Sequence, residues 1–256
     1  MTTQLGGAES GGGNPSPATA IAPRQGSGQM FDQIAERYDL LNRIMSLGID
    51  RGWRDRAVRE LSPLVDPARP LRILDVATGT GDVAFAIASA YPTAEIVGID
   101  PSTGMLGVAG QKRERSRHAD RVRFTTGSAE ALPFEDGAFD GVTISFGIRN
   151  VPDRALGVRE MGRVLRPGGR LVILELSEPR GGLFGALAKF HVHHFVPFVG
   201  ALLSGKQEYR YLQRSIAAFP PAEQFARLIA DQGFDVHTVA PLTFGTAHLY
   251  VAERRA

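Results

Sequence analysis

The sequence predicts a doubly wound α/β fold, in which a mostly parallel sheet ends in one antiparallel strand pair. Three observations predict it. Short apolar runs rich in branched residues alternate with helical patterns from Leu71 to Gln232. A glycine-rich turn follows the first of these runs. Two further strand patterns share residues 234–253 with only a short link between them, so they should pair antiparallel.

Residues 1–29 precede this alternation and consist mostly of Gly, Ser, Pro, Thr and Ala. Such a segment buries too little apolar surface to offset the entropy cost of ordering it, so we expect a disordered tail. It also lacks the basic-then-apolar order of a secretory signal. In residues 30–63, apolar side chains recur at helical spacing, Gly48 interrupts them and Pro63 ends them. We therefore expect a helical lead-in that could fold over the sheet as a lid.

The remaining elements follow in order, and residues 30–256 are expected to form one Rossmann-like domain. Each expected strand is a short apolar run, and each expected helix repeats its apolar residues at helical spacing. An apolar stretch over residues 180–215 breaks the alternation and is expected to be a helical insertion. The expected strands are 71–77, 95–100, 122–127, 139–146, 169–176 and two within 234–253, and the expected helices are 83–91, 103–115, 153–165 and 223–232.

The composition is that of an ordinary soluble protein, with 43% hydrophobic and 22% charged residues. A formal net charge of +2 argues neither for nor against nucleic acid. The basic cluster Lys112–Arg117 lacks interleaved aromatic residues, so we expect a solvated helix end and no nucleic-acid partner. The absence of cysteine excludes disulfides and thiolate metal sites, and it fits a cytoplasmic location. We expect no metal, because His191 and His194 share a helical face without a nearby carboxylate.

The run ILDVATGTGDVA is the most informative segment, because it places Gly79 and Gly81 in a turn between a strand and a helix. Glycines there let the backbone approach a ligand closely. The next expected strand ends at Asp100, where a carboxylate can accept hydrogen bonds from both hydroxyls of a ribose. This pair of features predicts a site for an adenosine-type nucleoside. The alternative is a turn that only packs a helix on a strand, with Asp100 capping the next helix.

Charge distinguishes between two cofactors of this type. Residues 79–84 satisfy G-x-G-x-x-A, the dinucleotide fingerprint. However, Asp75 and Asp82 place carboxylates on either side of the turn. These would repel a pyrophosphate and attract a cofactor that carries an ammonium and a sulfonium. We therefore favour S-adenosylmethionine, and an NAD-dependent oxidoreductase remains the alternative from a different enzyme class.

Several segments resemble known motifs. DVATGTGD, GIDPSTGML, SAEALPFEDGAFD and VLRPGGRL are similar, in order, to the motifs of class I methyltransferases. More narrowly, the chain resembles the UbiE-type C-methyltransferases of menaquinone and ubiquinone biosynthesis over residues 30–251. This resemblance implies methyl transfer to a ring carbon of a polyprenylated quinol, either a naphthoquinol or a benzoquinol. The narrower match is carried by FDQIAERYDLLNRIMSLGIDRGWR, TISFGIRNVPD, YLQRSIAAFPP and LTFGTAHLY.

The resemblance also implies which residues contact the cofactor. One position departs from the family pattern, because Tyr250 stands where the family has a histidine in its last strand. Another lipophilic small molecule therefore remains an alternative acceptor. The implied cofactor contacts, beside Gly79 and Gly81, are Thr80, Asp100, Ser128, Ala129 and Ser145.

Methylation of a quinol requires a proton route and a positive or hydrogen-bonding group near the ring oxygen. Arg149 and Asn150 follow the fourth expected strand, and we expect them to be the catalytic residues. The guanidinium keeps its proton, so it would stabilise a phenolate and not act as the final base. The alternative is that Arg149 pairs with Asp153 and only caps the next helix. Tyr38 could place its ring beside the sulfonium, or it could simply pack in the core.

The expected helical insertion indicates which partners the protein contacts. Residues 181–205 are apolar with three histidines, but Lys189 and Pro197 make them a poor transmembrane span. We expect helices that cover a lipophilic quinol or touch the inner face of a membrane, with an ordinary core helix as the alternative. A homodimer is a further open hypothesis.

Overall fold

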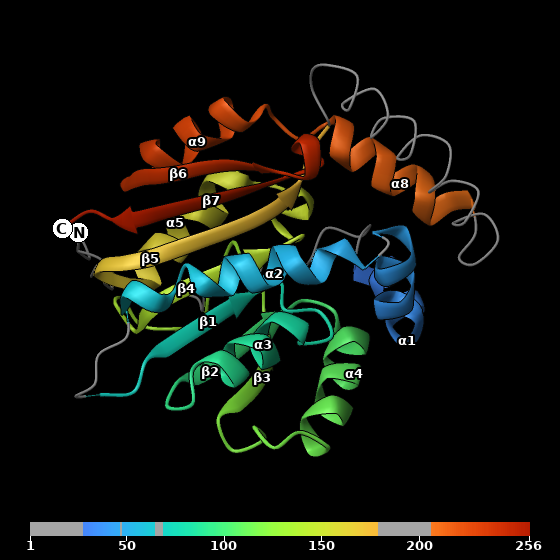
Figure 1. The fold of residues 1–256 in the computed structure, drawn as a ribbon, viewed down its shortest axis with the longest axis horizontal. Helices are drawn as coiled ribbons and strands as arrows, with labels where there is room; N and C mark the ends of the chain where they lie inside the picture. Colours follow the sequence, from blue (N-terminus) through green and yellow to red (C-terminus); the bar gives the residue numbers. More distant parts are fainter. Residues whose placement is uncertain (1–27, 47, 65–68, 179–205) are drawn as a thin grey trace, which may run out of the picture.

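The computed structural model describes residues 28–46, 48–64, 69–178 and 206–256. Within these ranges the chain forms a seven-stranded sheet of order β3-β2-β1-β4-β5-β7-β6 (Figure 1). Strands β1 to β5 are parallel, and β7 is antiparallel to both β5 and β6. The predicted α/β fold with an antiparallel C-terminal pair is confirmed. The strands are β1 Arg72–Val76, β2 Glu95–Asp100, β3 Val122–Thr126, β4 Phe139–Ser145, β5 Leu165–Leu176, β6 Phe234–Leu242 and β7 Ala247–Arg254.

Helices cover both faces of the sheet. The helices α2 and α3 pack on one face through Val58 and Ile87, and α5 and α9 pack on the other through Val158 and Phe225. The central strand β4 is buried along nearly its whole length, as expected for a parallel strand with helices on both sides. The helices are α1 Gly28–Met45, α2 Ile49–Arg59, α3 Asp82–Ala90, α4 Thr103–Glu114, α5 Arg154–Val164, α8 Lys206–Ala217 and α9 Ala222–Asp231, with short 3-10 turns η1 Ser62–Leu64, η2 Ile148–Asn150 and η4 Thr243–Gly245.

The lead-in is helical, as predicted, and its two helices meet at Gly48. This glycine has a φ of 77°, a left-handed backbone conformation that costs glycine little. The first helix, α1, lies at the end of the sheet toward which β1 and β5 point (Figure 1). In an open α/β sheet this is the edge where ligands bind.

The fifth strand begins earlier than the sequence indicates. It was expected from Gly169, but β5 starts at Leu165, directly after the last residue of α5. Leu165 pairs with Phe139 on β4, and an irregularity follows before regular pairing resumes at Arg170. Gly168, with a φ of 70°, permits that irregularity, and the Pro-Gly-Gly segment lies within β5, after α5 has already ended at Val164.

Two of the expected segments fall mainly outside the described residues. These are the N-terminal tail, of which only residues 28 and 29 are described, and the insertion, of which α8 is the described end. The membrane and metal arguments that rested on Lys189, His191, His194 and Pro197 therefore remain expectations. None of the described helices is both long and apolar enough to cross a membrane.

Candidate functional site

The sheet brings the expected cofactor residues to a single edge. Gly79 and Thr80 follow β1, Asp100 ends β2, Ser128 follows β3 and Ser145 ends β4. These four strands are parallel neighbours, so their carboxyl ends lie side by side. The residues are drawn from segments far apart in the sequence, yet the topology collects them around one region.

The shape of the glycine turn depends on the backbone conformation of its two glycines. Gly79 and Gly81 have φ values of 56° and 84°, which residues with a Cβ rarely adopt. A Cβ on Gly81 would also lie 2.7 Å from the ring of Phe124. Glycine is therefore required at Gly81 by both conformation and space, and the backbone N–H of Gly81 donates to the carbonyl of Thr78 at 2.9 Å, which closes the turn.

Asp100 is tied directly to this turn. Its two carboxylate oxygens accept hydrogen bonds from the backbone N–H of Gly79 at 2.8 Å and of Ser102 at 2.9 Å. Burial raises the pKa of Asp100, although these two hydrogen bonds oppose the rise. Asp100 therefore fixes the turn relative to β2, and each oxygen retains capacity to accept a further hydrogen bond.

Asp75 is a second buried carboxyl group at the same edge, on β1. It accepts hydrogen bonds from the hydroxyls of Thr78 at 2.6 Å and Thr143 at 2.7 Å. Burial raises its pKa to about 6, and the nearby charge of Asp100 adds to the rise. Among the described residues, neither Asp75 nor Asp100 forms an ion pair with a Lys or Arg side chain. The edge therefore carries acidic groups whose charge is not offset by a direct cationic partner.

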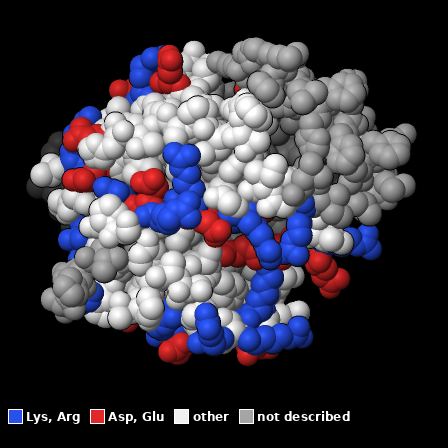
Figure 2. Space-filling model, viewed as in Figure 1, with Lys and Arg blue, Asp and Glu red and all other residues white. Residues whose placement is uncertain are grey.

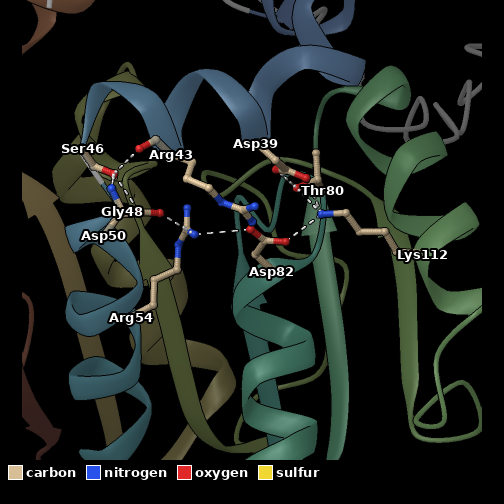
Figure 3. Close-up of polar contacts among 9 residues, drawn as sticks. All are labelled: Asp39, Arg43, Ser46, Gly48, Asp50, Arg54, Thr80, Asp82 and Lys112. Atoms are coloured by element: carbon tan, nitrogen blue, oxygen red, sulfur yellow. Dashed lines mark hydrogen bonds and ion pairs between the residues drawn. The ribbon is translucent and has the colours of Figure 1, made fainter.

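The lead-in helix is bound to the glycine turn. Acidic and basic side chains gather on the surface where α2, α3 and α4 approach one another (Figure 2). Figure 3 shows the polar contacts in this region, where the Thr80 hydroxyl donates to Asp39 of α1 at 2.6 Å. Lys112 Nζ of α4 lies 2.5 Å from Asp39, 2.7 Å from Asp82 and 3.1 Å from Thr80. Lys112 therefore joins α1, the turn and the start of α3.

This arrangement corrects two expectations. Lys112 was expected on a solvated helix end, but its ammonium contacts the residues of the turn. Asp82 was expected to contribute negative charge to the cofactor cleft, but Lys112 and Arg54 both contact it, Arg54 at 3.3 Å. Its charge is therefore offset, and the acidic character of the edge depends on Asp75 and Asp100.

Three further expected residues surround the edge. Ser128 accepts a hydrogen bond from the backbone N–H of Glu130 at 3.2 Å, which orders the loop after β3. Ala129 is buried in the core cluster beneath that loop. Tyr38 of α1 is half-buried, packs edge-on against Phe31 with ring centroids 6.0 Å apart, and contributes to the raised pKa of Arg149.

Arg149 and Asn150 lie in η2, directly after β4. The Arg149 guanidinium is buried, and its Nη1 donates to Glu175 at 2.6 Å and to the carbonyl of Phe146 at 2.6 Å. Burial has the largest single effect and lowers the pKa of Arg149, but the charge and hydrogen bond of Glu175, with smaller contributions from Tyr38 and Tyr211, together raise the net pKa. The side chain of Asn150 accepts a hydrogen bond from Tyr211 of α8 at 3.0 Å.

The alternative that Arg149 pairs with Asp153 and caps the next helix is wrong. Asp153 does cap α5, since it accepts from the backbone N–H of Leu156 at 2.9 Å, but Arg149 pairs with Glu175 instead. Sequence reasoning missed Glu175. The available signal was a single acidic residue near the end of an otherwise apolar strand pattern, GRLVILEL.

Tyr250, the position that departs from the family pattern, lies in the core. Its side chain is 1% exposed and packs edge-on against Phe225 with ring centroids 5.1 Å apart. Burial raises the pKa of Tyr250, with a further contribution from Glu175. Because Phe225 belongs to α9, this residue contributes to packing of the helix on the sheet.

Residues 21–254 match the model of the ubiE/COQ5 methyltransferase family. The chain is 45% identical to the demethylmenaquinone methyltransferase of Deinococcus radiodurans, over 92% of this chain and 97% of that protein. It is 48% identical to the ubiquinone/menaquinone biosynthesis C-methyltransferase UbiE of Geotalea uraniireducens, over 88% and 95%. The solved structure of the [4+2]-cyclase SpnF is similar in fold, with a TM-score of 0.64, 18% identity and coverage of 90% and 95%.

Proposed function

The chain belongs to the ubiE/COQ5 methyltransferase family, and we propose that it transfers a methyl group from S-adenosylmethionine to a ring carbon of a polyprenylated quinol. The substrate we favour is demethylmenaquinol, because the Deinococcus radiodurans relative is named for demethylmenaquinone. The observation that carries the proposal is chemical. Two buried acidic groups, Asp75 and Asp100, lie at a glycine turn without a direct cationic partner among the residues that the structure describes, and the Arg149–Asn150 pair follows the neighbouring strand.

The glycine turn and the acids fit the cofactor. Gly79 leaves room for a close approach to the backbone, because a Cβ there would meet nothing within 4 Å. Asp100 would accept the ribose hydroxyls through its remaining lone pairs. Thr80, Ser128, Ala129 and Ser145 would complete the contacts around the nucleoside. Bound S-adenosylmethionine supplies an electrophilic methyl group on a positively charged sulfur, which negative charge at this edge favours.

Arg149 and Asn150 would act on the substrate. A quinol carbon becomes a stronger nucleophile when its ring hydroxyl loses a proton, and a positive group near that oxygen stabilises the phenolate. Arg149 suits this role because it stays protonated at neutral pH. The carbonyl oxygen of Asn150 accepts a hydrogen bond from Tyr211, which orients the amide, and its N–H groups would donate to a substrate oxygen.

The lead-in helix would complete the site. Tyr38 lies near Arg149, and Asp39 of the same helix contacts Thr80 of the cofactor turn. Closure of α1 over both groups would exclude water from the reacting atoms. We also propose that residues 180–215 cover the lipophilic part of the quinol or contact the membrane surface that supplies it.

The test is to incubate the protein with S-adenosylmethionine labelled in its methyl group. Demethylmenaquinol, a demethylated benzoquinol and total lipid extracts from cells blocked in quinone methylation are offered as acceptors. We expect the label on the quinol ring, and the preferred ring system identifies the natural acceptor. Label on another lipid would replace the quinol with a different acceptor. No transfer to any of them, with the cofactor bound, would contradict the proposal.

A further inference from the structure

Glu175 is a fully buried acid near the end of β5 that pairs with Arg149. Its side chain is 0% exposed, and the side chain of its partner Arg149 is 6% exposed. A buried ion pair costs desolvation energy and is weak evidence for stability by itself. Its position beside the substrate-side residues therefore calls for a functional explanation.

The hydrogen-bond partners of Glu175 match a carboxylate better than a protonated carboxyl group. One oxygen accepts from Arg149 Nη1 at 2.6 Å and from the backbone N–H of Leu176 at 2.8 Å, and the other accepts from the backbone N–H of Arg149 at 3.1 Å. These three groups are all donors. A carboxylate matches three donors, whereas a protonated carboxyl group would need an acceptor for its hydrogen. Glu175 is therefore suited to be a fixed anion and not a proton acceptor for the substrate.

The contacts hold Arg149 at two points. Glu175 binds both the backbone N–H and the guanidinium Nη1 of the same residue, and the carbonyl of Phe146 also accepts from Nη1. Nη1 of the guanidinium is thus held by two acceptors, the carboxylate of Glu175 and the carbonyl of Phe146. Its Nε is buried and has no hydrogen-bond partner among the described residues. A buried donor without a partner is unfavourable, so an acceptor arriving with the substrate would satisfy it.

We propose that Glu175 is a positioning residue for methyl transfer, which fixes the Arg149 guanidinium so that its remaining donor groups meet the ring oxygen of the substrate. The inference rests on the proposed function, in which Arg149 stabilises a phenolate. Glu175 itself touches neither substrate nor cofactor in this account. Its effect on the reaction passes through Arg149.

The first variant is Glu175→Gln, which keeps the shape of the side chain. Glutamine has one acceptor oxygen, and its amide group would face N–H donors that Glu175 now accepts. We expect kcat to fall about 10- to 100-fold, by analogy with the loss caused by removing a residue that orients a metal ligand. The KM values and the affinity for S-adenosylhomocysteine should stay close to wild type, because the lost interaction matters only in the transition state.

A matched control separates positioning from loss of a buried charge. Asp140 is also buried, and it pairs with Arg69 and Arg166 near the start of β4, at the opposite end of the strand from the site. Asp140→Asn should lower the melting temperature at least as much as Glu175→Gln while leaving kcat unchanged. If Glu175→Gln does not fold, Glu175→Asp keeps the charge and shortens the side chain, and it should also lower kcat.

A double-mutant cycle tests whether the effect passes through Arg149. In an Arg149→Met background, adding Glu175→Gln should cause no further loss of kcat. A full additional loss in the double variant, or an unchanged kcat in a folded Glu175→Gln protein, would overturn the inference. The two proposals fail differently, because a wild-type protein that methylates no quinol refutes the proposed function before Glu175 is examined.

Discussion

The hydroxyl of Thr80 donates a 2.6 Å hydrogen bond to Asp39, a residue 41 positions earlier in the chain. The bond joins the glycine turn to the lead-in helix, and Lys112 contacts both of its partners. Any movement of α1 away from the sheet must break this set of contacts. The position of the helix and the order of the turn are therefore linked.

Asp39→Asn should weaken cofactor binding, because the neutral amide loses the ion pair with Lys112 that holds α1 on the turn. Both side chains are partly exposed, so we expect a loss of about 1 kcal/mol, or about fivefold in affinity. Calorimetry with S-adenosylhomocysteine measures this directly. Asp235→Asn is the control, since it breaks an exposed pair with Arg255 far from the site. Equal affinities for all three proteins would contradict the linkage.

Asp75 should make stability depend on pH. Its pKa is 3.8 when unfolded and about 6 when folded, so the folded state binds more protons between these values. Stability contributed by this group is therefore present below about pH 4 and declines by about 3 kcal/mol as the pH rises through 6. Asp75→Asn removes that decline, because asparagine does not titrate.

Thermal unfolding of wild type and Asp75→Asn across this pH range checks the sign. The variant should match wild type near pH 4 and become the more stable protein near pH 7. A stability difference that is constant with pH, or that favours wild type at neutral pH, would show that Asp75 is not the buried titrating group.

Arg149→Lys should lower kcat about 100- to 1,000-fold, comparable to removing one donor that stabilises a developing oxyanion. Lysine keeps the positive charge beside Glu175 but lacks the planar, multi-donor geometry of guanidinium. Affinity for S-adenosylhomocysteine and the melting temperature should change little. Steady-state kinetics with a quinol acceptor measures kcat, and a kcat equal to wild type would show that the reaction needs only a positive charge at this position and not the guanidinium geometry.

Tyr250→Phe should leave kcat unchanged and should not destabilise the fold. The Tyr250 hydroxyl is buried without a hydrogen-bond partner among the described residues. Removing such a group is neutral or stabilising, by about 1–3 kcal/mol at most. Urea unfolding measures the change. A clear loss of stability would mean that the hydroxyl has a partner, and a loss of activity would return this position to the substrate site.

The sequence was sufficient for features that depend on local spacing. The alternation of strands and helices specified the sheet, and the short link before β7 specified its antiparallel pairing. The separation of Gly79 from Asp100 brought the turn and the acid together, and the backbone hydrogen bond between them follows from it.

The charge partners could not be obtained from the sequence, because they depend on how distant elements pack. Lys112 and Asp39 are 73 positions apart, and Arg149 and Glu175 are 26 apart. Nothing local distinguishes Lys112 from the basic residues that follow it. The nearest acid to Arg149 along the chain, Asp153, is used as a helix cap instead. The packing of α1 brings Asp39 to Lys112, and the position of β5 brings Glu175 to Arg149.

Isothermal titration calorimetry with S-adenosylmethionine and with NAD measures most directly whether acidic groups at the glycine turn select a nucleoside that carries a sulfonium over one that carries a pyrophosphate. We expect heat of binding for S-adenosylmethionine and none for NAD under the same conditions. Tight binding of NAD with no binding of S-adenosylmethionine would refute this selection.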